Sequence, residues 1–229
     1  MKRFIAWALC LLLCFISMSA LAEQNFDMDV FNKGGWKVSI DDMEQRGFIS
    51  SSNIISTSMS YQPEYIYDDD IDCRHIKVTP DIYLAKYGTK NFVPYPRIWF
   101  DMHSKYKIYG WTFVQSIIIK VDDTTYTFEG NVFGNTTDTE SWYYGSGWTT
   151  ENMVCVCTDT EFIDAWIATN NPVKVRLKGS NSQVDFYLPT GSVQAIREMF
   201  VAFRDAGGYD YFKAIPHKPR QKTTKPLLL

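Results

Sequence analysis

The feature that most constrains the fold is a pair of alternating apolar runs within residues 172–189. The runs flank residues 179–182, Gly-Ser-Asn-Ser, which are turn-forming residue types. If Lys178 pairs with Gln183, the apolar side chains of both runs fall on one side of a β-hairpin. These side chains are Val173, Val175, Leu177, Val184, Phe186 and Leu188. A one-residue shift would turn one apolar set toward water, so the pattern predicts the register as well as the hairpin.

The polar side of this hairpin pairs opposite charges. The same register places Arg176 opposite Asp185 and Lys174 opposite Tyr187. We expect Arg176 and Asp185 to form a surface ion pair that contributes about 0.2–1 kcal/mol. The alternative is that Arg176 binds an anionic ligand.

Two helices are predicted around the hairpin. Residues 158–161, Thr-Asp-Thr-Glu, match a capping box and open a short helix that ends at residues 170–172, Asn-Asn-Pro. After the hairpin, Thr190 or Ser192 is expected to cap a longer helix that ends at Gly207-Gly208. Its apolar stripe is Val193, Ile196, Met199, Phe200 and Phe203.

This C-terminal segment carries a family resemblance. A short helix, the hairpin PVKVRLKG…VDFYLP and a helix of the AIREMF type follow one another. The order resembles the C-terminal part of invasion-associated-locus-B-like proteins and of related uncharacterised bacterial exported proteins. The resemblance implies a bacterial envelope β-domain without known catalytic residues.

The rest of the chain is rich in strand patterns. A second hairpin is expected over residues 110–130, with Asp122-Asp123 in its turn. Other strands are expected at residues 26–31, 36–40, 48–55, 74–87 and 97–109, with Pro94 and Pro96 as a break and residues 131–147 as a polar loop. The predicted fold is mainly β: an antiparallel β-sandwich or curved sheet with two α-helices in the C-terminal half.

The N-terminus indicates export. Residues 1–22 combine a basic start, an apolar run and Ala20-Leu21-Ala22, which is typical of a secretory signal peptide and its cleavage site. We expect a periplasmic or secreted protein with no transmembrane segment after signal removal. Residues 23–212 are predicted to form a single β-rich domain, of which 23–96 is the N-terminal part, and residues 213–229 a flexible basic tail.

The charge distribution argues against a nucleic-acid partner. Residues 23–72 carry eleven acidic and three basic side chains, whereas residues 73–229 carry fifteen acidic and eighteen basic ones. A nucleic-acid footprint requires a strongly basic patch, and this balance predicts none.

Signal removal leaves three cysteines, and export makes a disulfide plausible. Cys155 and Cys157 share one face of a strand at a spacing of about 6.5–7 Å, which is at or beyond the usual Cα limit for a bridge between them. We therefore expect a Cys73–Cys157 disulfide, with Cys155 as the alternative partner of Cys73. A metal site from Cys73, His75, Cys155 and Cys157 does not match zinc spacings, so neither a metal nor a cofactor is predicted.

One aromatic stretch is the candidate binding site. Trp142, Tyr143, Tyr144 and Trp148 lie in and after the polar loop, where they are suited to stack on a sugar ring or to anchor a protein. The alternative is that the tryptophans pack over a sheet edge. No nucleophile, Walker or Rossmann motif is present. The favoured function is a non-enzymatic binding domain with a protein or glycan partner in the cell envelope, and the alternative is a secreted hydrolase.

Overall fold

The computed structural model describes most of the predicted domain. The described residues are 26–32, 35–41, 43–51, 57–61, 74–86, 92–106, 114–129, 137–141, 147–180 and 183–212. The predicted signal peptide, the basic tail, Cys73 and residues 142–146 lie outside them.

The described residues form strands and helices in the following order. They are α2 (Asp29–Asn32), β1 (Trp36–Asp41), β2 (Arg46–Ser51), β3 (Thr57–Tyr61), β4 (Arg74–Lys86), β5 (Phe92–Tyr106), β6 (Val114–Val121), β7 (Thr124–Glu129), β8 (Thr137–Ser141), β9 (Gly147–Val156), α3 (Thr160–Ala168), β10 (Lys174–Gly179), β11 (Gln183–Tyr187), α4 (Thr190–Asp205) and the 3-10 turn η1 (Gly208–Tyr211).

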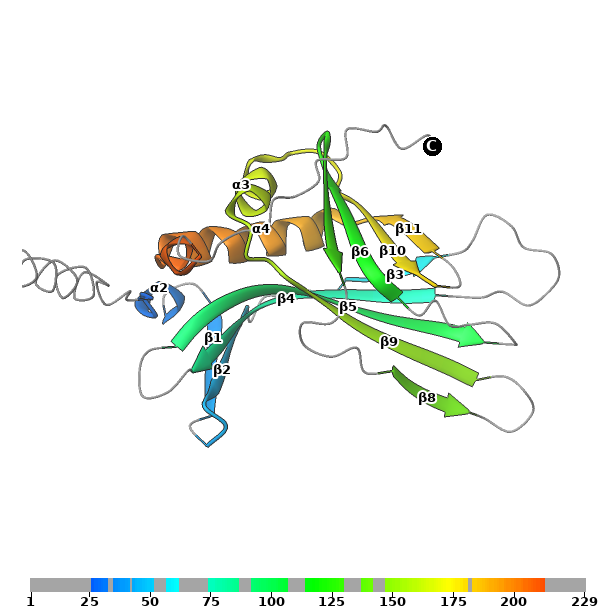
Figure 1. The fold of residues 1–229 in the computed structure, drawn as a ribbon, viewed down its shortest axis with the longest axis horizontal. Helices are drawn as coiled ribbons and strands as arrows, with labels where there is room; N and C mark the ends of the chain where they lie inside the picture. The colour runs from blue at the N-terminus through cyan, green and yellow to red at the C-terminus, as the bar shows by residue number, and fades with distance from the viewer. Residues whose placement is uncertain are drawn as a thin grey trace, which may run out of the picture.

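The strands build two antiparallel sheets, which confirms the predicted fold class. The large sheet has seven strands in the order β1-β2-β4-β5-β9-β8, with β3 also paired to β4. The small sheet has the order β11-β10-β6-β7. The small sheet, α3 and α4 all lie on one side of the large sheet, its inner face, and β1 and β2 hang away from that side (Figure 1).

The predicted C-terminal hairpin is confirmed. Its register pairs Val175 with Phe186, Arg176 with Asp185 and Lys178 with Gln183. The six apolar side chains predicted to share a face are all buried. Burying the whole set on one side is what makes the one-residue shift unfavourable.

The core lies between the inner faces of the two sheets and the helices. Phe100 of β5 and Phe186 of β11 meet with ring centroids 6.4 Å apart, which joins the large sheet to the small one. Phe162 of α3 contacts Tyr126 of β7 at 4.9 Å and Phe200 of α4 at 5.9 Å. The apolar stripe predicted for α4 is buried. A shared aromatic core therefore holds both helices against both sheets.

The predicted break at Pro94 and Pro96 is wrong, because β5 runs through both prolines. Pro96 accepts a hydrogen bond through its carbonyl oxygen from the backbone N–H of Cys157, so its polar backbone edge faces the β9 side. Pro94 has the same strand parity. The ladder to β4 therefore loses no donor, which is the condition under which a sheet tolerates proline.

Two other local predictions are also wrong. Residues 26–31 were expected as a strand, but they lead into α2, where Asp27 Oδ1 accepts the N–H of Asp29 at 3.0 Å. Residues 131–147 were expected as a loop, but they contain β8, an edge strand paired with β9. Polar, threonine-rich edge strands lack the apolar alternation that marks a half-buried strand.

The helix starts differ from the predicted caps by one or a few residues. Asp159, not Thr158, caps α3, because its Oδ1 accepts the N–H groups of Glu161 and Phe162. Pro189 occupies the cap position of α4, so neither Thr190 nor Ser192 serves as the side-chain cap. The predicted left-handed end of α4 is confirmed at Gly207, which has φ 82°.

Both described cysteines are fully buried, and neither is part of a disulfide. The structure therefore does not contain the expected disulfide at Cys157. The Cys157 thiol instead lies 3.7 Å from the carbonyl oxygen of Cys155, to which it donates. Burial raises the pKa of the Cys155 thiol well above its usual value.

A buried carboxylate joins the two sheets. Glu151 of β9 is 3 % exposed, and its Oε2 accepts the backbone N–H of Val114, the first residue of β6, at 3.0 Å. A buried acceptor that meets a strand-end donor satisfies both groups.

Among the described residues, the helices are too short or too polar to cross a bilayer.

Candidate functional site

The most organised polar cluster lies on the outer face of the large sheet, the side turned away from α4. Strand alternation places Asp81 and Tyr83 of β4 and Arg97 and Trp99 of β5 on this face. Phe48 of β2 joins them, because it pairs with Tyr83 in the β2–β4 ladder. We call these five residues the Arg97 cluster.

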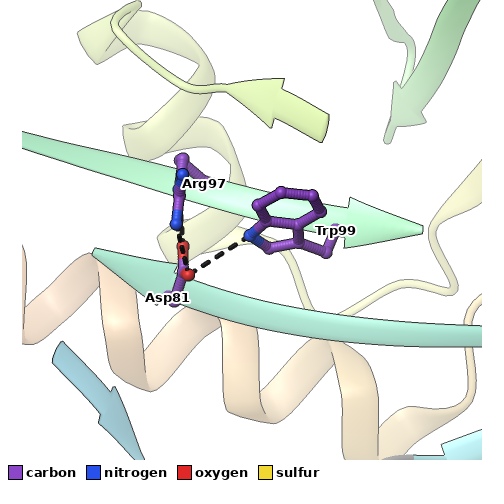
Figure 2. Close-up of polar contacts among 3 residues, drawn as sticks. All are labelled: Asp81, Arg97 and Trp99. Carbon is purple, nitrogen blue, oxygen red and sulfur yellow. Dashed lines mark hydrogen bonds and ion pairs between the residues drawn. The ribbon is translucent and has the colours of Figure 1, made fainter. Parts of the chain in front are cut away.

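Arg97 and Asp81 form an enclosed bidentate ion pair. Arg97 donates from Nε to Asp81 Oδ1 at 2.8 Å and from Nη2 to Asp81 Oδ2 at 2.6 Å. Trp99 Nε1 donates to the same Oδ2 at 3.2 Å (Figure 2). The two charged side chains are only 5 % and 14 % exposed. In a pair this enclosed, the hydrogen bonds have to replace the lost water.

Three aromatic rings surround the guanidinium group. Its Cζ atom lies 4.7 Å from the ring centre of Tyr83, 4.9 Å from that of Trp99 and 5.5 Å from that of Phe48. Phe48 and Tyr83 also contact each other, with centroids 5.5 Å apart. Each ring is half-buried. Arginine over an aromatic face contributes about 0.5–2 kcal/mol, depending on desolvation.

The geometry limits the chemistry of the cluster. Both oxygens of Asp81 accept hydrogen bonds and the side chain is 14 % exposed, so this carboxylate is turned mainly toward partners within the chain. Two donors of Arg97 are directed at Asp81, so that edge of the guanidinium is not available for bidentate binding of an anion. What the cluster offers a partner is the partly exposed surface of three rings in fixed positions.

A groove lies on the other side of the large sheet. It has a volume of about 410 Å³ and lies between α4 and the segment from α2 to β1. Val30, Trp36, Val201 and Ala202 supply apolar lining, and Arg197 lies among its polar residues. Arg197 is engaged within the chain, because Nη1 donates to Gln194 and Nη2 to the carbonyl oxygen of Thr169.

The predicted aromatic site falls mostly outside the described residues. Trp142, Tyr143 and Tyr144 are not among them. Trp148 belongs to β9, where its backbone pairs with Lys105 of β5. Positions 148 and 154 of β9 fall on the same face of the sheet by strand alternation, and position 154 pairs with Trp99.

The backbone register separates the cysteines of β9 from the histidine positions. His75 pairs with His103, which pairs with Thr150, whereas Cys155 pairs with Ile98. Five strand positions separate the two rows, or about 17 Å at the usual strand rise. A metal site that includes His75 and Cys155, or a cysteine nucleophile with a histidine partner, would require these residues to be neighbours. This register does not bring Cys155 next to His75. Within the described part of the chain, no group of three potential metal ligands forms.

Sequence reasoning missed the Arg97 cluster. The sequence did contain a signal for it. Asp81 and Tyr83 lie two positions apart on one strand, and Arg97 and Trp99 lie two positions apart on the next. The expected break at Pro94 and Pro96 hid the continuous β4–β5 pairing that brings the two pairs together. A cross-strand cluster depends on a register that only the paired strands define.

Comparisons with protein-family models, with curated proteins and with solved structures find no match to this chain.

Proposed function

We propose that this chain is an exported domain of the bacterial cell envelope that binds a protein or glycan partner and does not catalyse a reaction. The observation that carries this proposal is the Arg97 cluster. Its rings lie on one sheet face, and the enclosed Arg97–Asp81 pair holds them in place. Rigid aromatic rings give a partner a large contact area at low entropic cost. The loop of Trp142, Tyr143 and Tyr144, together with Trp148, is proposed as a further contact.

Export is proposed from the N-terminal sequence. The pattern of residues 1–22 supports cleavage after Ala22 and release to the periplasm or the medium. The C-terminal resemblance to invasion-associated-locus-B-like proteins is consistent with an envelope location.

Two observations favour binding over the hydrolase alternative. The Asp81 carboxylate accepts three hydrogen bonds from Arg97 and Trp99 and is only 14 % exposed, so water has little access to it. The Cys155 thiol is fully buried and its pKa is raised, which makes it a poor nucleophile.

The test is capture of partners by the immobilised mature chain. Bacterial envelope extract and purified peptidoglycan are offered to wild type, to Tyr83→Leu with Trp99→Leu, and to Trp142→Ala with Tyr144→Ala. The matched control is Glu161→Gln, an exposed position on α3 that lies in neither sheet. We expect wild type and the control to retain the same specific partner and the Tyr83/Trp99 variant to lose it.

The outcome depends on folding as well as on capture. Each variant is compared with wild type by near-ultraviolet circular dichroism, and Trp99→Phe, which keeps an aromatic ring, is included as a milder change. If all folded variants retain what wild type retains, or if wild type retains nothing above blank resin, the proposed binding face is wrong.

A further inference from the structure

The outer face of the small sheet, the side turned away from the core, is rich in basic side chains. Strand alternation places Lys174, Arg176 and Lys178 of β10 on this face, and Lys120 of β6 beside them. Lys120 and Lys178 are exposed, and the other two are partly exposed. Alternate residues of a strand are about 6.5–7 Å apart, so β10 presents a regular line of positive charge.

Two of these charges face each other at a cost to stability. Lys174 pairs directly with Lys120 in the β10–β6 ladder, and the other register neighbour of Lys120 is Thr125. Like charges at directly opposite positions destabilise a sheet. The Lys174 ammonium lies 3.8 Å from Asp185, whose oxygens already accept from Arg176. Asp185 is therefore shared by Arg176 and Lys174, so this carboxylate does not offset the positive charge of Lys120.

The carboxylates at the outward positions do not balance the bases. They are Asp185 on β11 and Glu129 on the edge strand β7, where Glu129 pairs with Ser116. Asp122, in the turn between β6 and β7, accepts hydrogen bonds from Thr169 and Asn171. Four bases against two acids give this face a positive charge, whereas the whole chain carries a net charge of −3.

An exposed aromatic ring adjoins the basic line. Tyr187 of β11 is 59 % exposed, and the Lys174 ammonium lies 5.8 Å from its ring centre. Thr125 and Thr127 supply hydroxyl groups at the outward positions of β7. Bases, hydroxyls and an exposed ring on one flat face fit a sugar polymer that carries acidic groups, because the ring can stack on a sugar.

We propose that the outer face of the small sheet binds an acidic polysaccharide that lies along β10. Lys120, Lys174 and Lys178 receive its carboxylates or sulfates, and Tyr187 stacks on a sugar ring. This face and the Arg97 cluster belong to different sheets, so the proposal does not rest on the function proposed above.

The test measures binding of the mature chain to polygalacturonate, with neutral dextran, inorganic polyphosphate and phosphatidylglycerol vesicles as comparison probes. Wild type is expected to bind polygalacturonate, to lose affinity as salt screens the charges, and to ignore dextran. Lys120→Gln with Lys178→Gln is expected to bind about three- to tenfold more weakly. Tyr187→Ala is expected to weaken binding to polygalacturonate but not to polyphosphate.

Stability provides an internal control. Because Lys120→Gln relieves the repulsion from Lys174, the double variant should melt at the same temperature as wild type or higher while it binds less. Lys77→Gln, an exposed base on the large sheet, should change neither property.

Three outcomes overturn the proposal. The first is no binding of polygalacturonate by wild type. The second is unchanged binding by the folded double variant. The third is binding of polyphosphate or lipid vesicles with equal or greater affinity and no effect of Tyr187→Ala, which would assign the face to a phosphate-rich partner.

Discussion

At the scale of single residues, the Arg97 cluster shows how a sheet face accommodates a buried charge. The Arg97 side chain is 5 % exposed, and Asp81 and three rings take the place of solvent around its guanidinium group. Such a pair is expensive to break but adds little compared with an apolar pair, because desolvation offsets the attraction.

Asp81→Asn is therefore expected to destabilise the fold by about 3–5 kcal/mol, because it leaves the Arg97 charge buried without its counter-charge. Adding Arg97→Met to Asp81→Asn should restore part of this loss, since no buried charge then remains. Urea unfolding of wild type, both single variants and the double variant measures the coupling. Additive losses would show that the pair does not act as a unit.

Two adjacent glycines after α4 should both resist replacement by alanine, each for a different physical reason. A Cβ at position 208 would lie 2.3 Å from Cε2 and Cζ of Phe203, whose ring is fully buried. Gly208→Ala should cost roughly 1–3 kcal/mol through overpacking. Gly207→Ala should cost about 1–2 kcal/mol, because φ at this position is 82°. Thermal unfolding compares them, and Phe203→Leu in the Gly208→Ala background should recover stability if the clash is the cause.

At the scale of elements, helix α3 depends on one side chain at its start. Asp159 accepts the N–H groups of Glu161 and Phe162, at 2.8 and 3.3 Å. Asp159→Ala should cost about 1 kcal/mol, whereas Thr158→Ala should stay within about 0.5 kcal/mol. Urea unfolding of the two variants distinguishes the observed cap from a capping box that begins at Thr158. Equal losses would contradict the observed cap.

The β10–β11 hairpin should carry part of the acid sensitivity. The Arg176 guanidinium, which donates to Asp185 at 2.6 Å through both Nε and Nη2, lowers the pKa of that carboxyl below its usual 3.8. Because the folded pKa is the lower one, the ion pair stabilises the fold above pH 3.8 and loses this effect as the pH falls through the folded value.

The stability difference between wild type and Asp185→Asn should accordingly be full near neutral pH and shrink below a pH of about 4. Urea unfolding at several pH values measures it. Asp123→Asn, an exposed aspartate with no resolved role in this hairpin, is the matched control. A difference that stays constant down to a pH of about 2 would show that Asp185 titrates alike in both states.

At the scale of the whole molecule, the cysteines report on the integrity of the core. Cys155 and Cys157 line the inner face of the large sheet with no exposure to solvent. A thiol reagent at neutral pH should therefore not modify either one in the folded protein, and should modify both after unfolding in guanidinium. Mass spectrometry of the labelled peptides gives the result. Rapid labelling of the native protein, or a disulfide-linked peptide that contains Cys157, would contradict two buried thiols that form no disulfide.

Local patterns predicted the hairpin of β10 and β11, both C-terminal helices and the Asp122-Asp123 turn. In each case the informative residues lie within a few positions of one another, so alternation, helical periodicity and turn chemistry act on the same short segment. Errors arose where a segment's role depends on a distant neighbour. The tolerance of Pro94 and Pro96 depends on which edge of β5 faces β4, and β8 depends on the strand beside it.

The sequence by itself determined a β-rich chain, the face that each C-terminal strand buries, and the register that follows from burying that face. Only the tertiary structure decided that Asp81, Arg97 and their rings meet, that Lys120 joins the bases of β10 on one face of the small sheet, and that Cys157 is not part of a disulfide. The physical reason is that burial periodicity is encoded within each segment, whereas contacts between side chains of different strands depend on sheet order and stagger. Sheet order and stagger are settled by the packing of the whole core at once.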